Sequence, residues 1–119
     1  MKWIRVLALS LSLWGWGYGV AIAAQPSLGS SFRQWCLQRS SLPAETRKTV
    51  EVLLIEAGTS DCEKADEILS SLTELNLNRN QITDVSPLSG LTNLRRLNLK
   101  NNPAAQPTCP VSPPNVCSF

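Results

Sequence analysis

Hydrophobic and polar residues alternate in two short stretches of the chain that begin 22 residues apart. In residues 74–78 (ELNLN), and again in residues 96–100 (RLNLK), each leucine stands between two polar residues. A period of two is typical of a strand that points one set of side chains into a core and the other set into solvent. The pattern therefore predicts two short strands with buried leucines and exposed polar residues.

The residues between these stretches predict how the strands are connected. Parallel neighbours need a crossover of a dozen or more residues, and 17 residues separate the two stretches. Pro87 and Gly90 interrupt any long helix there. We therefore expect an arc of turns and short helical pieces, with hydrophobic anchors at Ile82, Val85, Leu88, Leu91 and Leu94.

Residues 27–71 show helical spacing instead. The first expected helix has four hydrophobic residues on one face: Leu28, Phe32, Trp35 and Cys36. A second begins after Pro43, which is favourable in a first turn, and ends at Gly58, which suits a left-handed cap. Its inward residues are Val50, Leu53, Leu54 and Ala57.

A third helix is expected to run to about Ser70. Ser60 and Glu63 have the spacing of a capping box at its start. Its inward side is expected to consist of Ala65, Ile68 and Leu69.

An asparagine follows each predicted strand at the same spacing, at positions 80 and 102. Where a chain leaves a strand and bends inward, its backbone groups are buried without ladder partners, at a cost of about 1–3 kcal/mol for each. An asparagine amide supplies both a donor and an acceptor. We therefore expect Asn80 and Asn102 to form a structural ladder, with Asn80 bonded to the backbone of the following turn.

Residues 1–24 have the pattern of a secretory signal peptide. Lys2 and Arg5 precede a hydrophobic stretch, and the sequence AIAA follows it. Cleavage after Ala23 or Ala24 would leave a chain that is secreted or periplasmic. The alternative is an uncleaved membrane anchor, since residues 6–24 are nearly long enough to span a bilayer.

Charge excludes one class of partner once this segment is set aside. Nine basic residues then remain against nine acidic ones. The basic surface that nucleic acid requires is therefore not expected. The length predicts a single small domain.

Four cysteines remain in an exported chain, which predicts disulfides. Three pairings are possible, but the cysteines form two clusters that flank the repeat. This favours Cys36 with Cys62, worth about 3.5 kcal/mol by loop entropy, and Cys109 with Cys117, worth about 2.6 kcal/mol.

The segment LTELNLNRNQITDVSPLSGLTNLRRLNLKNNP resembles the leucine-rich repeat proteins, in the 22-residue class of bacterial internalins. The flanking FRQWCLQRSSLPAETRKTVEVLLIEAGTSDC and TCPVSPPNVC are similar to the caps of secreted cyanobacterial-type, internalin-like proteins. The resemblance implies an α/β fold: a short solenoid of two parallel strands with turn and short-helix arcs, and an N-terminal helical cap.

This resemblance divides the chain into four parts: a signal peptide (1–24), a helical cap (25–71), repeats (72–103) and a disulfide-closed C-terminal cap (104–119). In the second copy Pro103 takes the place of the core isoleucine and begins a tail with five prolines in 17 residues. Prolines cannot donate to another strand, so we expect this tail to close the sheet edge.

The resemblance implies protein binding on the concave strand face and carries no catalytic residue. We call the outward side chains of the two strands the strand face: Glu74, Asn76, Asn78, Arg96, Asn98 and Lys100. The expected ligand is a protein or a glycan, and the protein is expected to bind it as a monomer. Arg96 is expected to contribute most to binding, because arginine is favoured at interface hot spots. The alternative is a structural or vestigial protein, since an ordinary interface buries about 800 Å² on each partner and two short strands offer less.

Other chemistry has little support in the sequence. The chain has no histidine, which excludes Ser-His-Asp and Cys-His sites within it. The acidic residues near position 63 lie where a helix begins and lack the spacing of a calcium loop. We therefore expect no enzyme activity, cofactor or metal.

Overall fold

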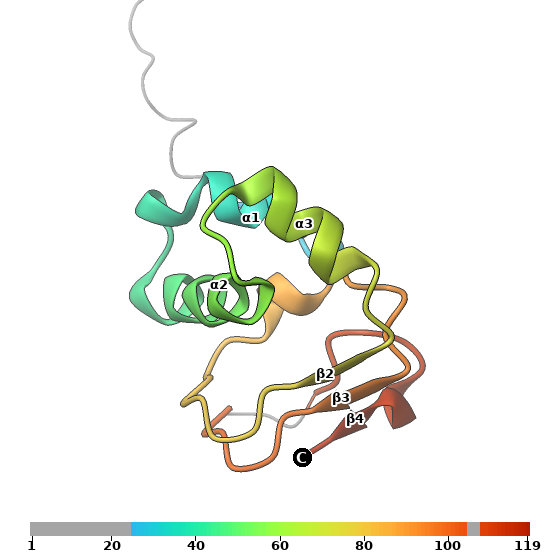
Figure 1. Ribbon diagram of the computed structural model, residues 1–119. Helices are drawn as coiled ribbons and strands as arrows, with labels where there is room; N and C mark the ends of the chain where they lie inside the picture. Colours follow the sequence, from blue (N-terminus) through green and yellow to red (C-terminus); the bar gives the residue numbers. More distant parts are fainter. Residues whose placement is uncertain (1–24, 105–107) are drawn as a thin grey trace, which may run out of the picture.

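The computed structural model describes residues 25–104 and 108–119, so the predicted signal peptide lies outside the described residues. Three helices gather in one half of the molecule and a small parallel sheet forms the other half (Figure 1). The predicted α/β class is therefore correct.

The first helix, α1 (Phe32–Leu37), is shorter than expected. Ser31 caps it by accepting a hydrogen bond from the Gln34 N–H, and the Gln34 side chain bonds back to the Ser31 N–H. Gly29 before it has a left-handed φ of 90°, which interrupts helical geometry. Leu28 consequently lies outside the helix with 74% of its surface exposed, and its predicted place in the core is wrong.

The second helix, α2 (Ala44–Ala57), has the predicted ends. Pro43 occupies the N-cap position and Gly58 the C-cap, with a left-handed φ of 75°. Val50 and Leu53 are fully buried, whereas Leu54 and Ala57 are half-buried at the rim. A short 3-10 turn, η3 (Arg39–Ser41), connects α1 to this helix.

The third helix, α3 (Cys62–Ser70), begins one residue later than the capping box predicted. Asp61, not Ser60, caps it: the carboxylate accepts from the N–H groups of Glu63 at 2.9 Å and Lys64 at 3.2 Å. Ile68 is 41% exposed, so its predicted inward position is wrong, because the buried face follows Cys62, Ala65 and Leu69.

The two predicted strands are β2 (Glu74–Asn76) and β3 (Arg96–Asn98). They are parallel and in register at the 22-residue spacing, with Leu75 opposite Leu97. Pairing continues past the strand ends, since the Leu77 N–H donates to the Asn98 carbonyl at 2.8 Å. The alternating leucines are buried as expected.

A third strand, β4 (Cys117–Ser118), corrects the prediction of a two-stranded sheet with a closed edge. It pairs in parallel with β3, with Leu97 opposite Cys117. The last proline of the tail is Pro114, the first residue of the 3-10 turn η5 (Pro114–Val116). The strand β4 therefore contains no proline and keeps its N–H groups. The Leu99 N–H donates to the Ser118 carbonyl at 2.8 Å.

At a spacing of 22, Gln81 aligns with Pro103, and the buried Ile82 aligns with Ala104. Alanine therefore replaces the core isoleucine, and the proline lies one residue before it. Pro103 itself is exposed.

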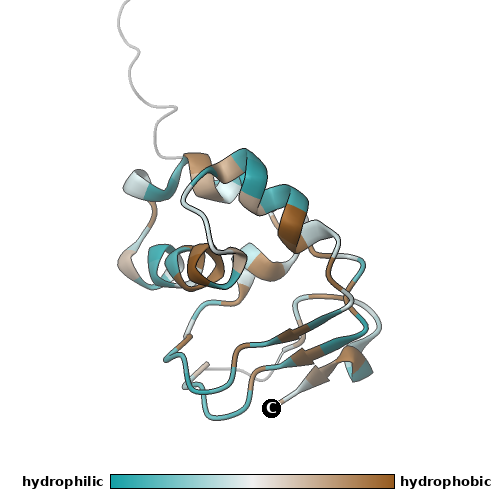
Figure 2. Ribbon diagram, in the orientation of Figure 1, coloured by the Kyte–Doolittle hydropathy of each residue, from teal (hydrophilic) through white to brown (hydrophobic). Residues whose placement is uncertain are grey.

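One hydrophobic core joins the helices to the sheet. The arc between β2 and β3 contains a short 3-10 turn, η4 (Ser86–Leu88), which contacts both α1 and α2. Each helix carries both hydrophobic and hydrophilic residues along its length (Figure 2), as expected for elements with one buried side. The arc contributes buried residues that include Ile82, Pro87, Leu88, Leu91 and Leu94.

The segment before α1 lies against this arc. The Gly29 N–H donates to the Ser89 hydroxyl at 2.8 Å. A Cβ at Gly90 would overlap the Ser30 backbone carbonyl, so only glycine fits at this contact. The helical half (residues 25–71) and the repeat half (from residue 72 onward) are thus in contact. This contact lies on the side away from the strands' outward side chains.

Candidate binding face

The structure brings five of the six predicted residues of the strand face around one open depression. Its volume is about 480 Å³, and it follows the outward side of all three strands. Ser118 of β4 also lines the depression and was missed, because it follows Asn98 by 20 residues rather than 22. Asn78 is not among its lining residues. The polar lining residues are Glu74, Asn76, Arg96, Asn98, Lys100 and Ser118.

Asn76 and Asn98, in the centre of this face, also end their strands. The Asn76 Oδ1 accepts from the Asn78 N–H at 3.0 Å, and the Asn98 Oδ1 accepts from the Lys100 N–H at 2.9 Å. These are Asx turns at equivalent positions of the two copies. The side-chain amide oxygens of Asn76 and Asn98 therefore already accept backbone hydrogen bonds within the protein.

The turns after the strands have matched left-handed residues. Arg79 has φ 60° and Asn101 has φ 62°, again 22 residues apart. The Asn101 Nδ2 donates to the Asn78 Oδ1 at 2.8 Å, which joins one turn to the next. Asparagine tolerates this backbone region better than most residues.

Asn102 makes the main contacts of the expected ladder. Its Oδ1 accepts from the N–H groups of Asn80 at 2.9 Å and Ile82 at 3.0 Å. Its Nδ2 donates to the carbonyls of Leu77 and Leu99, both at 2.9 Å. One side chain thereby satisfies backbone groups of both copies.

Asn80 has a smaller role than expected. Its Nδ2 donates to the Asn78 carbonyl at 3.2 Å, not to the following turn. The direction of the ladder explains the difference, because Asn102 reaches back to the preceding repeat. Before β2 the chain forms α3, so Asn80 has no earlier repeat turn to reach.

Glu74 and Arg96 form an ion pair across β2 and β3. The Arg96 Nη1 lies 3.7 Å from the Glu74 Oε2, and the side chains are 81% and 66% exposed, respectively. An exposed pair at this distance contributes about 0–1 kcal/mol. Both groups are therefore available for exchange with another charged group.

A half-buried carboxylate, Asp84, joins α2 to the arc, and no sequence pattern marks it. Its Oδ2 accepts from the buried Thr46 hydroxyl, and its Oδ1 accepts from the Ser86 N–H at 2.9 Å. The fully buried Thr49 hydroxyl donates to the Asp84 carbonyl at 2.6 Å. Burial acts to raise the pKa of Asp84, but the hydrogen bonds from Thr46 and Ser86 outweigh it and lower that pKa.

The four cysteines lie at bonding distance in two pairs. The sulfur atoms of Cys36 and Cys62 are 2.07 Å apart, and those of Cys109 and Cys117 are 2.05 Å apart. Arg39 covers the first pair, with its Nη1 2.9 Å from the Cys36 carbonyl oxygen. Paired cysteines are typical of oxidising compartments.

Two other kinds of site are not found in the described ranges. Residues 25–104 and 108–119 contain no cluster of acidic residues or cysteines arranged to hold a metal ion. Within the same ranges, no helix is long and hydrophobic enough to span a membrane.

Comparison with known proteins agrees with the repeat pattern. Residues 70–107 match the family model described as leucine rich repeats, in two copies. No curated protein and no solved structure matches the chain. The matched segment holds β2, the arc and β3, and repeats of this kind generally mediate protein–protein interaction.

Proposed function

We propose that the chain is an exported, internalin-like binding module that holds a protein partner on the strand face. The observation that carries the proposal is the depression along β2, β3 and β4, in which the repeat spacing places Glu74 beside Arg96 and Asn76 beside Asn98. Function in this account needs no catalytic group, cofactor or metal.

The repeat architecture supports use of this face. We interpret the sheet and its arc as a short solenoid whose concave side carries the strands, with residues 25–71 as its N-terminal cap and residues 104–119 as its C-terminal cap. Each end then has one disulfide. These caps would compensate for a repeat number below the three that solenoids usually need.

Export is supported by the sequence of residues 1–24 and by the paired cysteines. We propose cleavage before Ala24 or Gln25 and a monomer in the cell envelope or outside the cell. N-terminal sequencing of the exported protein tests this, and recovery of intact Met1 in a membrane pellet would instead establish an anchor.

The binding proposal is tested by affinity isolation from the envelope fraction of the producing cell, with disulfides intact. A double variant, Arg96→Ala with Lys100→Ala, changes the strand face only. A matched double variant, Arg47→Ala with Lys48→Ala, removes the same charge from α2. We expect the first to lose the partner and the second to keep it.

The reverse result would place the binding site on the helical half. If the wild-type chain isolates no partner at all under these conditions, the protein is better explained as a structural one. Its small face is the feature that favours that alternative.

A further inference from the structure

The two halves of the chain after residue 24 differ in the sign of their net charge. Residues 25–71 hold seven acidic and five basic side chains, whereas residues 72–119 hold four basic and two acidic ones. Of the two acidic residues in the repeat half, Asp84 is held on the arc by Thr46 and Ser86, away from the strand face. The outward side of the sheet therefore carries a local excess of positive charge.

Two cations mark the ends of β3 on this face. Arg96 begins the strand, and Lys100 follows its end, with both exposed and both lining the depression. β3 ends at Asn98 and Lys100 begins the following turn, so their separation is at most the roughly 13 Å of four fully extended residues, and both side chains line the same depression. The Arg79 N–H donates to the Lys100 carbonyl at 3.1 Å, which places another basic residue next to Lys100.

The centre of the face is uncharged. Asn98 lies between the two cations, and Asn76 and Ser118 flank it on the neighbouring strands. Both asparagine oxygens already accept backbone hydrogen bonds. Their Nδ2 groups, which are donors, remain for a ligand.

Glu74 occupies the position that a ligand carboxylate would take. Its carboxylate lies 3.7 Å from the Arg96 guanidinium in an exposed pair. Such a pair is weak, so an incoming acidic group can displace it.

We propose that the strand face takes an extended acidic protein segment whose carboxylates are four residues apart. In an extended peptide, residues i and i+4 also lie on one side and about 13 Å apart, which is the upper limit for the spacing of Arg96 and Lys100 along the same depression. A sulfated or carboxylated polysaccharide fits less well, because its regular charges need a continuous basic stripe and here Asn98 and Glu74 interrupt it. This inference rests on the proposed function, since it names the chemistry of that same site.

The test is an NMR titration of the ¹⁵N-labelled protein, as exported with both disulfides intact. The probe is a nine-residue peptide of serine and threonine with glutamates at its third and seventh positions. The control peptide has glutamine at both. Millimolar peptide detects weak complexes, and we expect shifts at Arg96, Asn98, Lys100 and Ser118 that require the glutamates and shrink as salt rises.

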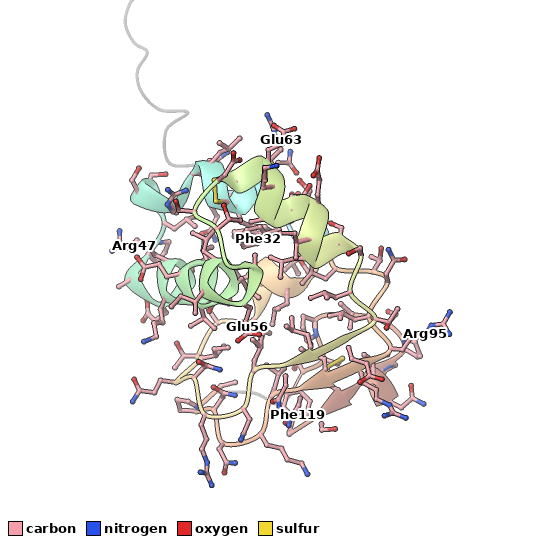
Figure 3. The ribbon with its side chains drawn as sticks, in the orientation of Figure 1. Phe32, Arg47, Glu56, Glu63, Arg95 and Phe119 are labelled. Atoms are coloured by element: carbon pink, nitrogen blue, oxygen red, sulfur yellow. A yellow bond between two sulfur atoms is a disulfide. The ribbon has the colours of Figure 1, made fainter. Side chains whose placement is uncertain are left out.

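Three variants identify the charges involved. Exposed pairs of this kind alter affinity by small factors, so Arg96→Gln and Lys100→Gln should each weaken binding about threefold. Glu74→Gln should strengthen it about twofold, because the competing carboxylate is gone. Arg47→Gln, a matched loss of one charge on α2, should change nothing. Figure 3 shows Arg47 on the opposite side of the molecule from Arg95, the residue directly before β3. Dispersed amide spectra verify that each variant is folded.

Equal shifts with the glutamate and glutamine peptides would overturn the inference, as would binding that maps to the helices. Binding of a sulfated oligosaccharide without binding of the peptide would replace it with the polysaccharide. If the envelope partner is isolated through Arg96 and Lys100 but the peptide does not bind, the proposed function stands and the acidic motif is wrong. If neither is observed, both fail.

Discussion

Asn102 is the single side chain on which the two repeat turns depend most. It bonds to backbone groups of both copies, including the carbonyls of Leu77 in the first copy and Leu99 in the second. We predict that Asn102→Ala lowers the free energy of unfolding by about 2–4 kcal/mol, because several buried groups lose their partner. Asn115→Ala, at an exposed position in η5, should cost within about 0.5 kcal/mol.

Urea melts of the two variants measure the difference. Asn80→Ala should fall between them, since Asn80 makes one side-chain bond to backbone. Equal losses for Asn102→Ala and Asn115→Ala would contradict the ladder.

Asp84 should make stability depend on pH in the acid range. Its pKa is lowered in the folded protein despite burial, through hydrogen bonds from Thr46 and Ser86. The unfolded chain therefore binds more protons as the pH falls below about 4, and the contribution of Asp84 to stability is lost there. Above that pH the contribution is fully present.

The measurement is a series of urea melts from pH 6 to pH 2 on the wild type and Asp84→Asn. The two proteins differ only at this side chain, so the difference between the two curves isolates Asp84. We expect a steeper acid loss in the wild type, and parallel curves would show that the carboxylate has no folded-state partner.

At the scale of elements, the contact between α2 and the arc decides whether the helical and repeat halves act as one unit. Thr49 is fully buried on α2 and donates to the Asp84 carbonyl. We predict that Thr49→Val destabilises the protein by about 1–3 kcal/mol, because that carbonyl is left without its partner. Thr92→Val, the same change at an exposed position, serves as the control. A loss no larger than the control's would mean that the Thr49 hydrogen bond contributes little to holding the helix on the arc.

The elements differ in how well the sequence predicts them, and the reasons are physical. β2 and β3 are visible because leucine alternation and a constant spacing report a local, repeated environment. β4 is hidden, since its pairing partner lies 20 residues away and prolines precede it. Competing caps one residue apart, Ser60 and Asp61, cannot be ranked by spacing alone.

The candidate site also has features that the sequence predicts and features that it does not. The outward residues of the two strands follow from alternation, but the Asx turns at Asn76 and Asn98 depend on backbone direction after the strand. Thr46 and Thr49 look like ordinary polar residues of a helix. Their burial against Asp84 arises only when α2 packs on the arc.

For the whole molecule, the two disulfides close separate ends of the chain. Non-reducing peptide mapping should recover Cys36 linked to Cys62 and Cys109 linked to Cys117. Loop entropy makes the first bond worth about 3.5 kcal/mol and the second about 2.6 kcal/mol. The Cys36→Ser, Cys62→Ser double variant should therefore lower the unfolding midpoint more than the variant lacking the second bond. A link between the two clusters would contradict the arrangement of the ends.

The measurement that tests the account most directly is site-specific photo-crosslinking in the producing cell. A photoreactive residue at position 74 lies on the strand face, and one at position 51 lies on the exposed side of α2. We predict a discrete protein adduct from position 74 that disappears in the Arg96→Ala, Lys100→Ala variant, and none from position 51. Adducts from position 51 alone, or equally from both, would contradict the claim that the strand face is the binding surface.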